Sequence, residues 1–203
     1  MIRYSVVIEQ PDSEPITLDQ AKDHLEYQGT LKDQAINSLI PTARRICEVY
    51  TGLSLITQER SIKMDRFPCY YNPIEVPYGP VQSILTFTYT NSDGDPTILV
   101  EGTDFLADYD SRICRLYAID SNGNKTSWPT DVKCMPNAIE VTYQAGYDDV
   151  SGELTPEQAR TGIKRVIAQL FEGRGDSDNG ECPDWTTKTI LDTIKVSWNA
   201  NYD

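Results

Sequence analysis

Residues 81–100, VQSILTFTYTNSDGDPTILV, decide the fold that this sequence predicts. Val81–Thr90 and Thr97–Val100 are rich in β-branched and aromatic residues, which is typical of strands with one buried face. Asn91–Pro96 lies between them, and its Asp-Gly pair supplies the positive φ that a tight hairpin turn needs. The stretch therefore predicts two antiparallel strands joined by a turn.

The same two-residue period extends outward from this hairpin, over residues 53–147. A second turn is expected at Ser121–Asn124. The other β-rich segments are 55–64, 105–107, 113–116 and 138–145. Because no helical pattern separates one strand from the next, we expect an antiparallel β insertion, and a parallel nucleotide-binding sheet is disfavoured.

Two helical patterns precede the β region. Thr17 can cap a helix of about residues 17–28, and a glutamine three residues later completes a capping box. A second helix is expected at about residues 33–51, with Asp33 as its cap and apolar residues three and four positions apart. Pro41 lies inside that pattern and predicts a kink, or a helix that begins at the proline. The short link predicts a helical hairpin.

A third helix, of about residues 156–172, follows the β region. Thr155 to Gln158 combine a cap, a proline at the first helical position and a capping-box glutamine, and Gly173 ends the pattern. The predicted fold is therefore α+β. It has a helical hairpin plus a C-terminal helix, an inserted antiparallel β region and an extended C-terminal tail.

The last part of the sequence is an acidic linker followed by an apolar tail. The linker is residues 174–181, and the apolar residues of the tail are Trp185, Ile190, Leu191, Ile194, Val196 and Trp198. Such a tail either packs on its own domain or buries these side chains in another chain. A linker rich in Gly, Asp and Ser permits the second arrangement.

The composition excludes several classes of protein. Asp and Glu outnumber Lys and Arg by 31 to 18, which gives a formal charge of -13 and disfavours sequence-specific DNA binding. No apolar run is long enough to span a membrane or to act as a signal peptide, so we expect a soluble protein made in the cytoplasm. The apolar fraction of 39% predicts a lean core that partner subunits help to complete.

The sequence contains no strong signature of catalysis, cofactor binding or metal binding. His24 is the only histidine, the five cysteines form no C-x-x-C pair, and no phosphate-binding or hydrolase motif is present. Asp104, Asp108 and Asp110 could hold Mg²⁺ or serve acid/base chemistry, although turn and strand-edge solubility is the simpler interpretation. We therefore expect no catalytic residue, no cofactor and no metal.

Two adjacent basic pairs lie on predicted helices. They are Arg44 with Arg45 and Lys164 with Arg165. Such pairs can bind an acidic surface of a neighbouring molecule, and solvated helix faces are the default interpretation. Arg44 and Arg45 are kept as candidate contacts.

Taken in order, several short motifs resemble the head-to-tail connector family of tailed bacteriophages. They are EPITLDQAKDHL at 14–25, Tyr50-Thr51-Gly52, LITQ at 55–58, DRFP at 65–68, PYGPVQS at 77–83, Trp128-Pro129 and VTYQAGY at 141–147. Each motif alone is weak, but the same order over most of the chain to about residue 174 is more specific. The resemblance thus predicts a connector domain of residues 1–174 and a linker with an interaction tail at 175–203.

The resemblance implies a structural protein of the virion, not an enzyme. Members of this family assemble as a ring, typically of twelve subunits, beneath the portal of the filled capsid. There the ring completes the head, lets DNA pass through its lumen and docks the tail or the next connector. The implied partners are other copies of the chain, the portal protein and a tail or stopper protein.

The resemblance also implies where the contacts lie. In the family the C-terminal segment commonly engages the portal or a neighbouring subunit. The candidate contact residues are therefore Trp185, Ile190, Leu191, Ile194 and Trp198, together with Arg44 and Arg45. The alternatives are another ring component of the virion, such as a stopper or tail-completion protein, and a metal-dependent hydrolase that uses the three aspartates.

Overall fold

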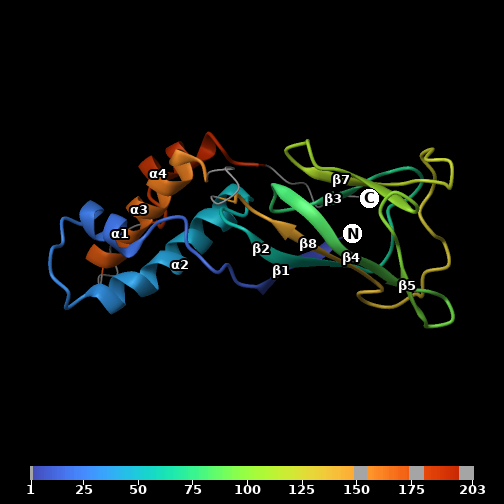
Figure 1. Ribbon diagram of the computed structural model, residues 1–203, viewed down its shortest axis with the longest axis horizontal. Coiled ribbons are helices and arrows are strands. Elements are labelled where there is room, and N and C mark those ends of the chain that lie inside the picture. Colours follow the sequence, from blue (N-terminus) through green and yellow to red (C-terminus); the bar gives the residue numbers. More distant parts are fainter. Residues whose placement is uncertain (1, 149–154, 174–180, 197–203) are drawn as a thin grey trace. The chain divides into compact units, whose positions relative to one another are not determined.

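The computed structural model describes residues 2–148, 155–173 and 181–196, with side chains described from Ser5 onward. Contacts divide these residues into two compact units (Figure 1). The β unit comprises residues up to 10 together with 57–146, and the helical unit comprises 11–56 together with 147–196. The predicted α+β class is confirmed, and each unit is assembled from segments distant in the sequence.

The β unit contains two antiparallel sheets. The five-stranded sheet has the order β1 (Ile2–Glu9), β2 (Gln58–Met64), β8 (Ile139–Ala145), β4 (Val81–Thr90) and β5 (Pro96–Ile98). The three-stranded sheet has the order β3 (Ile74–Val76), β7 (Cys114–Ala118) and β6 (Phe105–Asp108). The predicted hairpin is β4–β5, in which Thr88 pairs with Ile98.

The sequence analysis missed strands β1 and β3. β1 lies before the first predicted helix, yet it pairs with β2 in a register that sets Ser5 opposite Ile62. The exposed Val6 and Ile8 and the half-buried Ser5 and Val7 show the two-residue alternation of an edge strand. β3 has only three residues, too few for a visible period.

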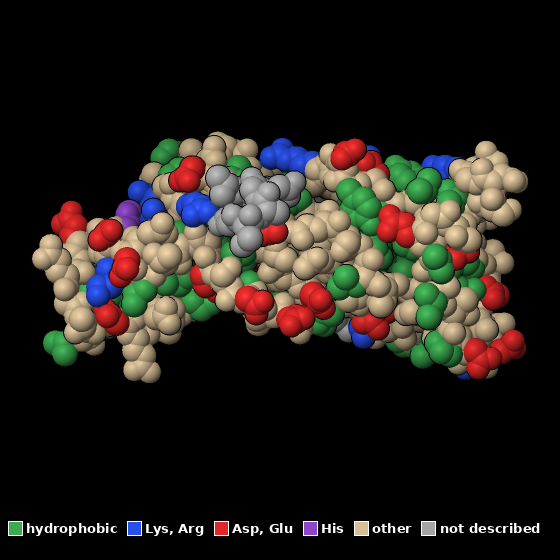
Figure 2. Space-filling view, in the orientation of Figure 1, with side chains coloured by type: hydrophobic (Ala, Val, Ile, Leu, Met, Phe, Trp, Pro, Cys, Tyr) green, Lys and Arg blue, Asp and Glu red, His purple; other side chains and the backbone are tan. Residues whose placement is uncertain are grey.

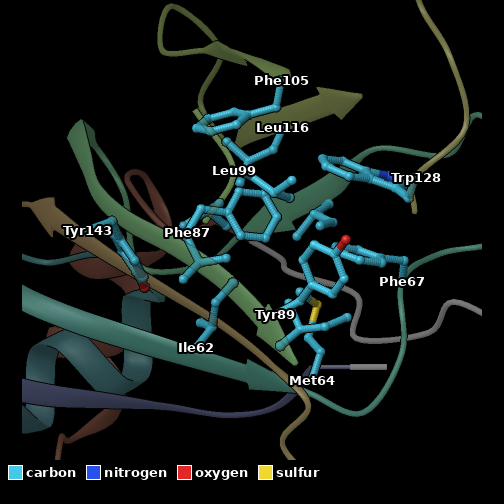
Figure 3. Packing of buried hydrophobic residues seen from close by; sticks show 14 of the residues in the cluster. Ile62, Met64, Phe67, Phe87, Tyr89, Leu99, Phe105, Leu116, Trp128 and Tyr143 are labelled. Carbon is cyan, nitrogen blue, oxygen red and sulfur yellow. The ribbon is translucent and has the colours of Figure 1, made fainter. Parts of the chain in front are cut away.

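Aromatic side chains form the centre of the β unit (Figure 3). Phe67 stacks on Trp128 with ring centroids 5.2 Å apart, and Phe87 meets Phe105 edge-on at the same distance. Tyr89 contacts the edge of Phe67 at 5.6 Å. Offset and edge-on pairs of this kind add about 0.5–1.5 kcal/mol each beyond the buried area.

One polar cluster is buried with this core. The Tyr143 hydroxyl donates to the carbonyl of Pro77 at 2.7 Å, and desolvation raises the pKa of Tyr143 to about 12. Arg60 is 1% exposed; its guanidinium lies 3.8 Å from the centroid of the Tyr78 ring and its Nε donates to Ser5 Oγ. The buried cation is therefore hydrogen-bonded through Nε and stacked on an aromatic ring, and both contacts offset the cost of burying its charge.

The helical unit contains four helices among the described residues: α1 (Leu18–His24), α2 (Asp33–Thr51), α3 (Glu157–Glu172) and α4 (Trp185–Asp192). The predicted capping box is present, since Gln20 N donates to Thr17 Oγ1 and Thr17 N donates to Gln20 Oε1. None of these helices is long and apolar enough to cross a membrane.

Two details of α2 differ from the sequence expectations. The helix spans Asp33–Thr51, as expected, and runs on past Pro41, so the alternative that it begins at the proline is wrong. Pro41 is exposed, which keeps its ring out of the core. Asp33 does not cap the helix either; the cap residue is Lys32, and the Asp33 carboxylate pairs with Lys22 at 2.7 Å.

The predicted capping box of the third helix is wrong. Pro156 is the cap residue of α3 and no side chain bonds to the free N–H groups of the first turn. The Thr155 hydroxyl instead donates to the carbonyl of Leu55 at 2.8 Å. Thr155 is 1% exposed, so its hydroxyl satisfies a buried carbonyl that water does not reach.

Candidate interaction surfaces

The C-terminal segment, expected as an extended tail, forms helix α4 and packs on its own helical unit. Leu191 is completely buried and lies over Gly162 of α3. A Cβ at position 162 would come within 2.6 Å of Leu191 Cδ2, so the glycine allows the close approach of α4 to α3. Of the two arrangements considered for the tail, packing on its own unit is the one observed for residues 185–196.

Polar contacts fix the start of α4. Asp184 Oδ1 accepts from Thr187 N at 2.7 Å, and its second oxygen pairs with Arg165 at 3.2 Å. The hydrogen bonds from Thr187 are the main cause of a lowered Asp184 pKa. Arg165, one of the basic residues singled out in the sequence, thus serves to anchor α4.

The end of α4 is also fixed, against the end of α2. The Tyr50 hydroxyl donates to Asp192 at 2.7 Å, and this bond raises the pKa of Tyr50. Lys195 lies 4.1 Å from the centroid of the Tyr50 ring, and Val196 N donates to the carbonyl of Thr51 at 2.8 Å. The segment is therefore held at both ends.

As a result of these contacts, the predicted tail residues differ widely in their exposure to solvent. Trp185 is 80% exposed, whereas Leu191 is completely buried. Ile190 and Ile194 are half-buried, and Ile194 packs against the helical core. Trp198 lies outside the described residues. Leu191 is thus part of the core, and Trp185 is the most exposed of the described members of this set.

The two arginines of the predicted basic pair on α2 also differ in their exposure to solvent. Arg44 is 3% exposed and bonds Glu14 at 2.8 Å and Glu48 at 3.1 Å. Glu48 also accepts from Leu55 N at 3.0 Å, so this network joins α2 to the chain that leaves it. The Arg45 side chain remains 47% exposed. Arg44 is therefore a structural residue, and only Arg45 is accessible.

Two of the three aspartates of the hydrolase alternative, Asp104 and Asp108, serve local structure. Asp104 accepts from Val100 N at 2.8 Å, and Asp108 accepts from the hydroxyl of Ser111. Asp110 is exposed. Among the described residues, no group of three His, Cys, Asp or Glu side chains is placed to hold a metal ion.

The β unit presents an aromatic loop that the sequence analysis missed. Tyr70 and Tyr71 are 82% and 58% exposed. The loop is pinned on both sides of them, by the stacked ring of Phe67 and by Trp128 Nε1, which donates to the carbonyl of Asn72 at 2.9 Å. The adjacent tyrosines between two prolines were the signal available in the sequence.

The β unit also has a hollow of about 400 Å³ beyond the end of β2. It is lined by Asp65, Arg66 and Val132–Pro136. Apolar and sulfur-containing side chains form its wall, with Met135 41% exposed, and two cationic side chains stand at its rim. Figure 2 shows acidic side chains spread over the visible face of the molecule, whereas the lining of the hollow has two cationic side chains and one carboxylate, Asp65.

Burial divides the free cysteines into two groups. Cys47 and Cys114 are buried, and desolvation raises the pKa of each thiol to about 12. Cys69, Cys134 and Cys182 are exposed. The exposed thiols are accessible to reagents, whereas the buried ones are protonated and enclosed.

Comparison with known proteins gives no match at the level of sequence. No family model matches the chain, and no curated protein matches it.

The fold does match solved structures over nearly its whole length. A chain of the neck of an empty gene transfer agent (GTA) particle, computed with C6 symmetry, has a TM-score of 0.73 at 17% identity, covering 98% of this chain and 100% of that one. A chain of the virion of a native GTA particle gives 0.72 at 15%, covering 98% and 99%. A chain of the neck of the native particle, computed with C12 symmetry, gives 0.67 at 16%, covering 98% and 100%. At these identities the likeness establishes a shared fold.

Proposed function

We propose that this chain is a structural head-to-tail connector of a phage-like particle. One observation carries the proposal: its fold matches, over 98% of its length, chains from the necks of GTA particles. Both units contribute to a match of that length.

The proposed assembly is a ring of about twelve copies in the neck of the virion. The C12 and C6 symmetries of the neck structures support a ring of that size. The ring would sit between the portal protein and a tail or stopper protein after assembly in the host bacterial cytoplasm. Trp185 and Arg45 are the most exposed of the described members of the predicted contact set.

In this role the chain acts by shape and association, not by catalysis. Two of the three aspartates of the hydrolase alternative, Asp104 and Asp108, are engaged in local hydrogen bonds, which favours the structural role. With a formal charge of -13 per copy, a ring would repel DNA phosphates, so DNA would pass through its lumen without sequence-specific binding.

Deleting the gene in a strain that produces the particles tests this function. We expect filled heads to lose their DNA and to remain without tails in electron micrographs. Restoring the wild-type gene should restore intact particles. Intact, DNA-containing, tailed particles in the deletion strain would overturn the proposal.

Gold labelling of a tagged copy separates the connector from other ring components of the virion. Label at the junction directly beneath the portal supports the connector. Label farther along the neck or tail identifies a stopper or a tail-completion protein.

A further inference from the structure

The hollow on the β unit has the chemistry of a socket for an aromatic side chain with acidic neighbours. Met135, Val132 and Pro136 supply apolar walls, and Arg66 and Lys133 are exposed at the rim. Among the described residues, neither cation forms an ion pair, although the chain carries thirteen more acidic than basic side chains. Unpaired cations beside apolar surface favour a ligand that is both aromatic and acidic.

The socket is held open by its own hydrogen bonds. Asp65 Oδ1 accepts from Asn137 N at 2.8 Å, and Lys133 N donates to the carbonyl of Thr90 at 2.9 Å. Val132 bridges to Asn91 at the end of β4. These bonds tie the loop to β4 and to the end of β2, so little ordering is required when a side chain enters.

Trp185 has the matching properties. It is 80% exposed and begins α4, whose ends are fixed by Asp184 and by the Tyr50–Asp192 bond. The sequence before it is acidic, with Glu172, Asp176, Asp178, Glu181 and Asp184 against Arg174. Of these, Asp184 pairs with Arg165 and Glu181 with Lys188, and the Glu181 side chain remains 81% exposed. The indole is therefore a rigid, exposed aromatic group on an anionic segment.

We propose that Trp185 of one copy inserts into this hollow on the β unit of the next copy. An indole buries about 150–250 Å², gains from contact with the Met135 sulfur and from cations over its face, and suits a hollow of about 400 Å³. The exposed carboxylate of Glu181, four residues before the indole, faces Arg66 and Lys133 at the rim. The inference deepens the proposed function, because it names a contact between neighbours in the ring.

A second copy is the occupant that the chain itself supports. Each copy carries one such tryptophan and one such hollow, on different surfaces, so the contact is heterologous and repeats from copy to copy. A repeating heterologous contact closes into a ring when its rotation permits. The complementary charges also favour this contact, since they attract the acidic helical unit of one copy to the cationic rim of another.

Exposed native cysteines provide a direct test. Cys134 lines the hollow and Cys182 lies three residues before Trp185, so the contact brings these thiols of neighbouring copies together. The full-length Cys69→Ser variant is treated with a short bis-maleimide at mildly alkaline pH, because partial burial raises the pKa of the Cys182 thiol. We expect a ladder of covalent oligomers, and mass spectrometry should find Cys134 joined to Cys182.

Single substitutions serve as controls for the ladder. Adding Cys134→Ser or Cys182→Ser should stop the products at the dimer or below. Trp185→Ala should lower the yield at least tenfold, whereas Leu31→Ala, which removes a side chain that is 98% exposed elsewhere, should leave it unchanged. A ladder that is indifferent to Trp185→Ala, or no Cys134–Cys182 product at any protein concentration, overturns the proposal.

Charge reversal tests the rim independently. Lys133→Glu should weaken assembly in sedimentation, and adding Glu181→Lys should restore it; lack of restoration counts against the rim contact. Failure of this contact is distinguishable from failure of the proposed function. Rings that form and complete particles without the cross-link would leave the connector role in place and remove only this interface.

Discussion

Single residues decide which parts of α4 are scaffold and which are free to bind. Leu191 fills the space above Gly162, while Trp185, less than two turns away on the same helix, is mostly in solvent. The two side chains serve different purposes although both are large and apolar. Truncating the C-terminal segment would therefore expose core surface as well as remove a contact, and point substitutions are the cleaner experiment.

Leu191→Ala should destabilise the protein by about 2–5 kcal/mol, because it leaves a cavity in the helical core. Trp185→Ala is the matched control and should change the free energy of unfolding by no more than about 0.5 kcal/mol. Urea unfolding followed by circular dichroism measures both. Equal losses of unfolding free energy for the two variants would contradict the burial of Leu191 and the exposure of Trp185.

The effect of Gly162→Ala on the free energy of unfolding should change sign, depending on whether position 191 holds leucine or alanine. In the wild type the new methyl group meets Leu191 and should cost about 1–3 kcal/mol through overpacking. In the Leu191→Ala background the clash is absent, and the same change should stabilise by up to about 1 kcal/mol through helix propensity. A double-mutant cycle on unfolding free energies measures this coupling.

Arg44→Ala should be costly and Arg45→Ala nearly neutral. Removing Arg44 deprives the buried Glu48 carboxylate of the nearer of its two arginine neighbours, which is also the buried one, and breaking a buried pair of this kind costs about 3–5 kcal/mol. The Arg45 side chain is 47% exposed and lies 3.9 Å from Glu48, so its removal should cost less than about 1 kcal/mol. Thermal unfolding of the two variants distinguishes these roles.

At the scale of elements, helix α4 shows which kind of feature could not be predicted from the sequence. The strands with turn chemistry and clear period, such as the β4–β5 hairpin, were predicted because their signals are local. The helical state of residues 185–192 was missed, because Asp184 as a cap and Leu191 as a core residue depend on contacts with Arg165 and Gly162 across the unit. The hollow is likewise built from residues distant in sequence.

The cap of α4 should respond to acid. The Asp184 pKa is lowered in the folded state, so its stabilising effect is present above the ordinary aspartate pKa of about 3.9 and is lost as the pH falls through the lowered value. Asp184→Asn keeps a capping oxygen but removes the charge. The difference in amide-exchange protection of α4 between wild type and Asp184→Asn should therefore shrink in acid; a difference that grows would contradict the assignment.

At the scale of the whole molecule, the two units have separate cores. Phe87 belongs to the core of the β unit and Ile167 to that of the helical unit. Large-to-small changes usually act most strongly within the cooperative unit that contains them. The chain is thus expected to behave as two stability units linked in one polypeptide.

Native-state hydrogen exchange tests this separation. Phe87→Ala should lower the protection of β2, β4 and β8 by about 3–5 kcal/mol, with a smaller effect on α2 and α3. Ile167→Ala should have the reverse pattern at about 2–5 kcal/mol. Equal loss of protection in both units from either substitution would instead indicate one cooperative block.

The strand order determines how late in synthesis the chain can complete its fold. β8 ends at Ala145 and separates β2 from β4 in the five-stranded sheet, so the early strands lack their central partner until that segment leaves the ribosome. Helix α4, which completes the other core, is made later still. A nascent chain therefore lacks its finished surfaces until both β8 and α4 have been made, which limits premature association among chains on neighbouring ribosomes.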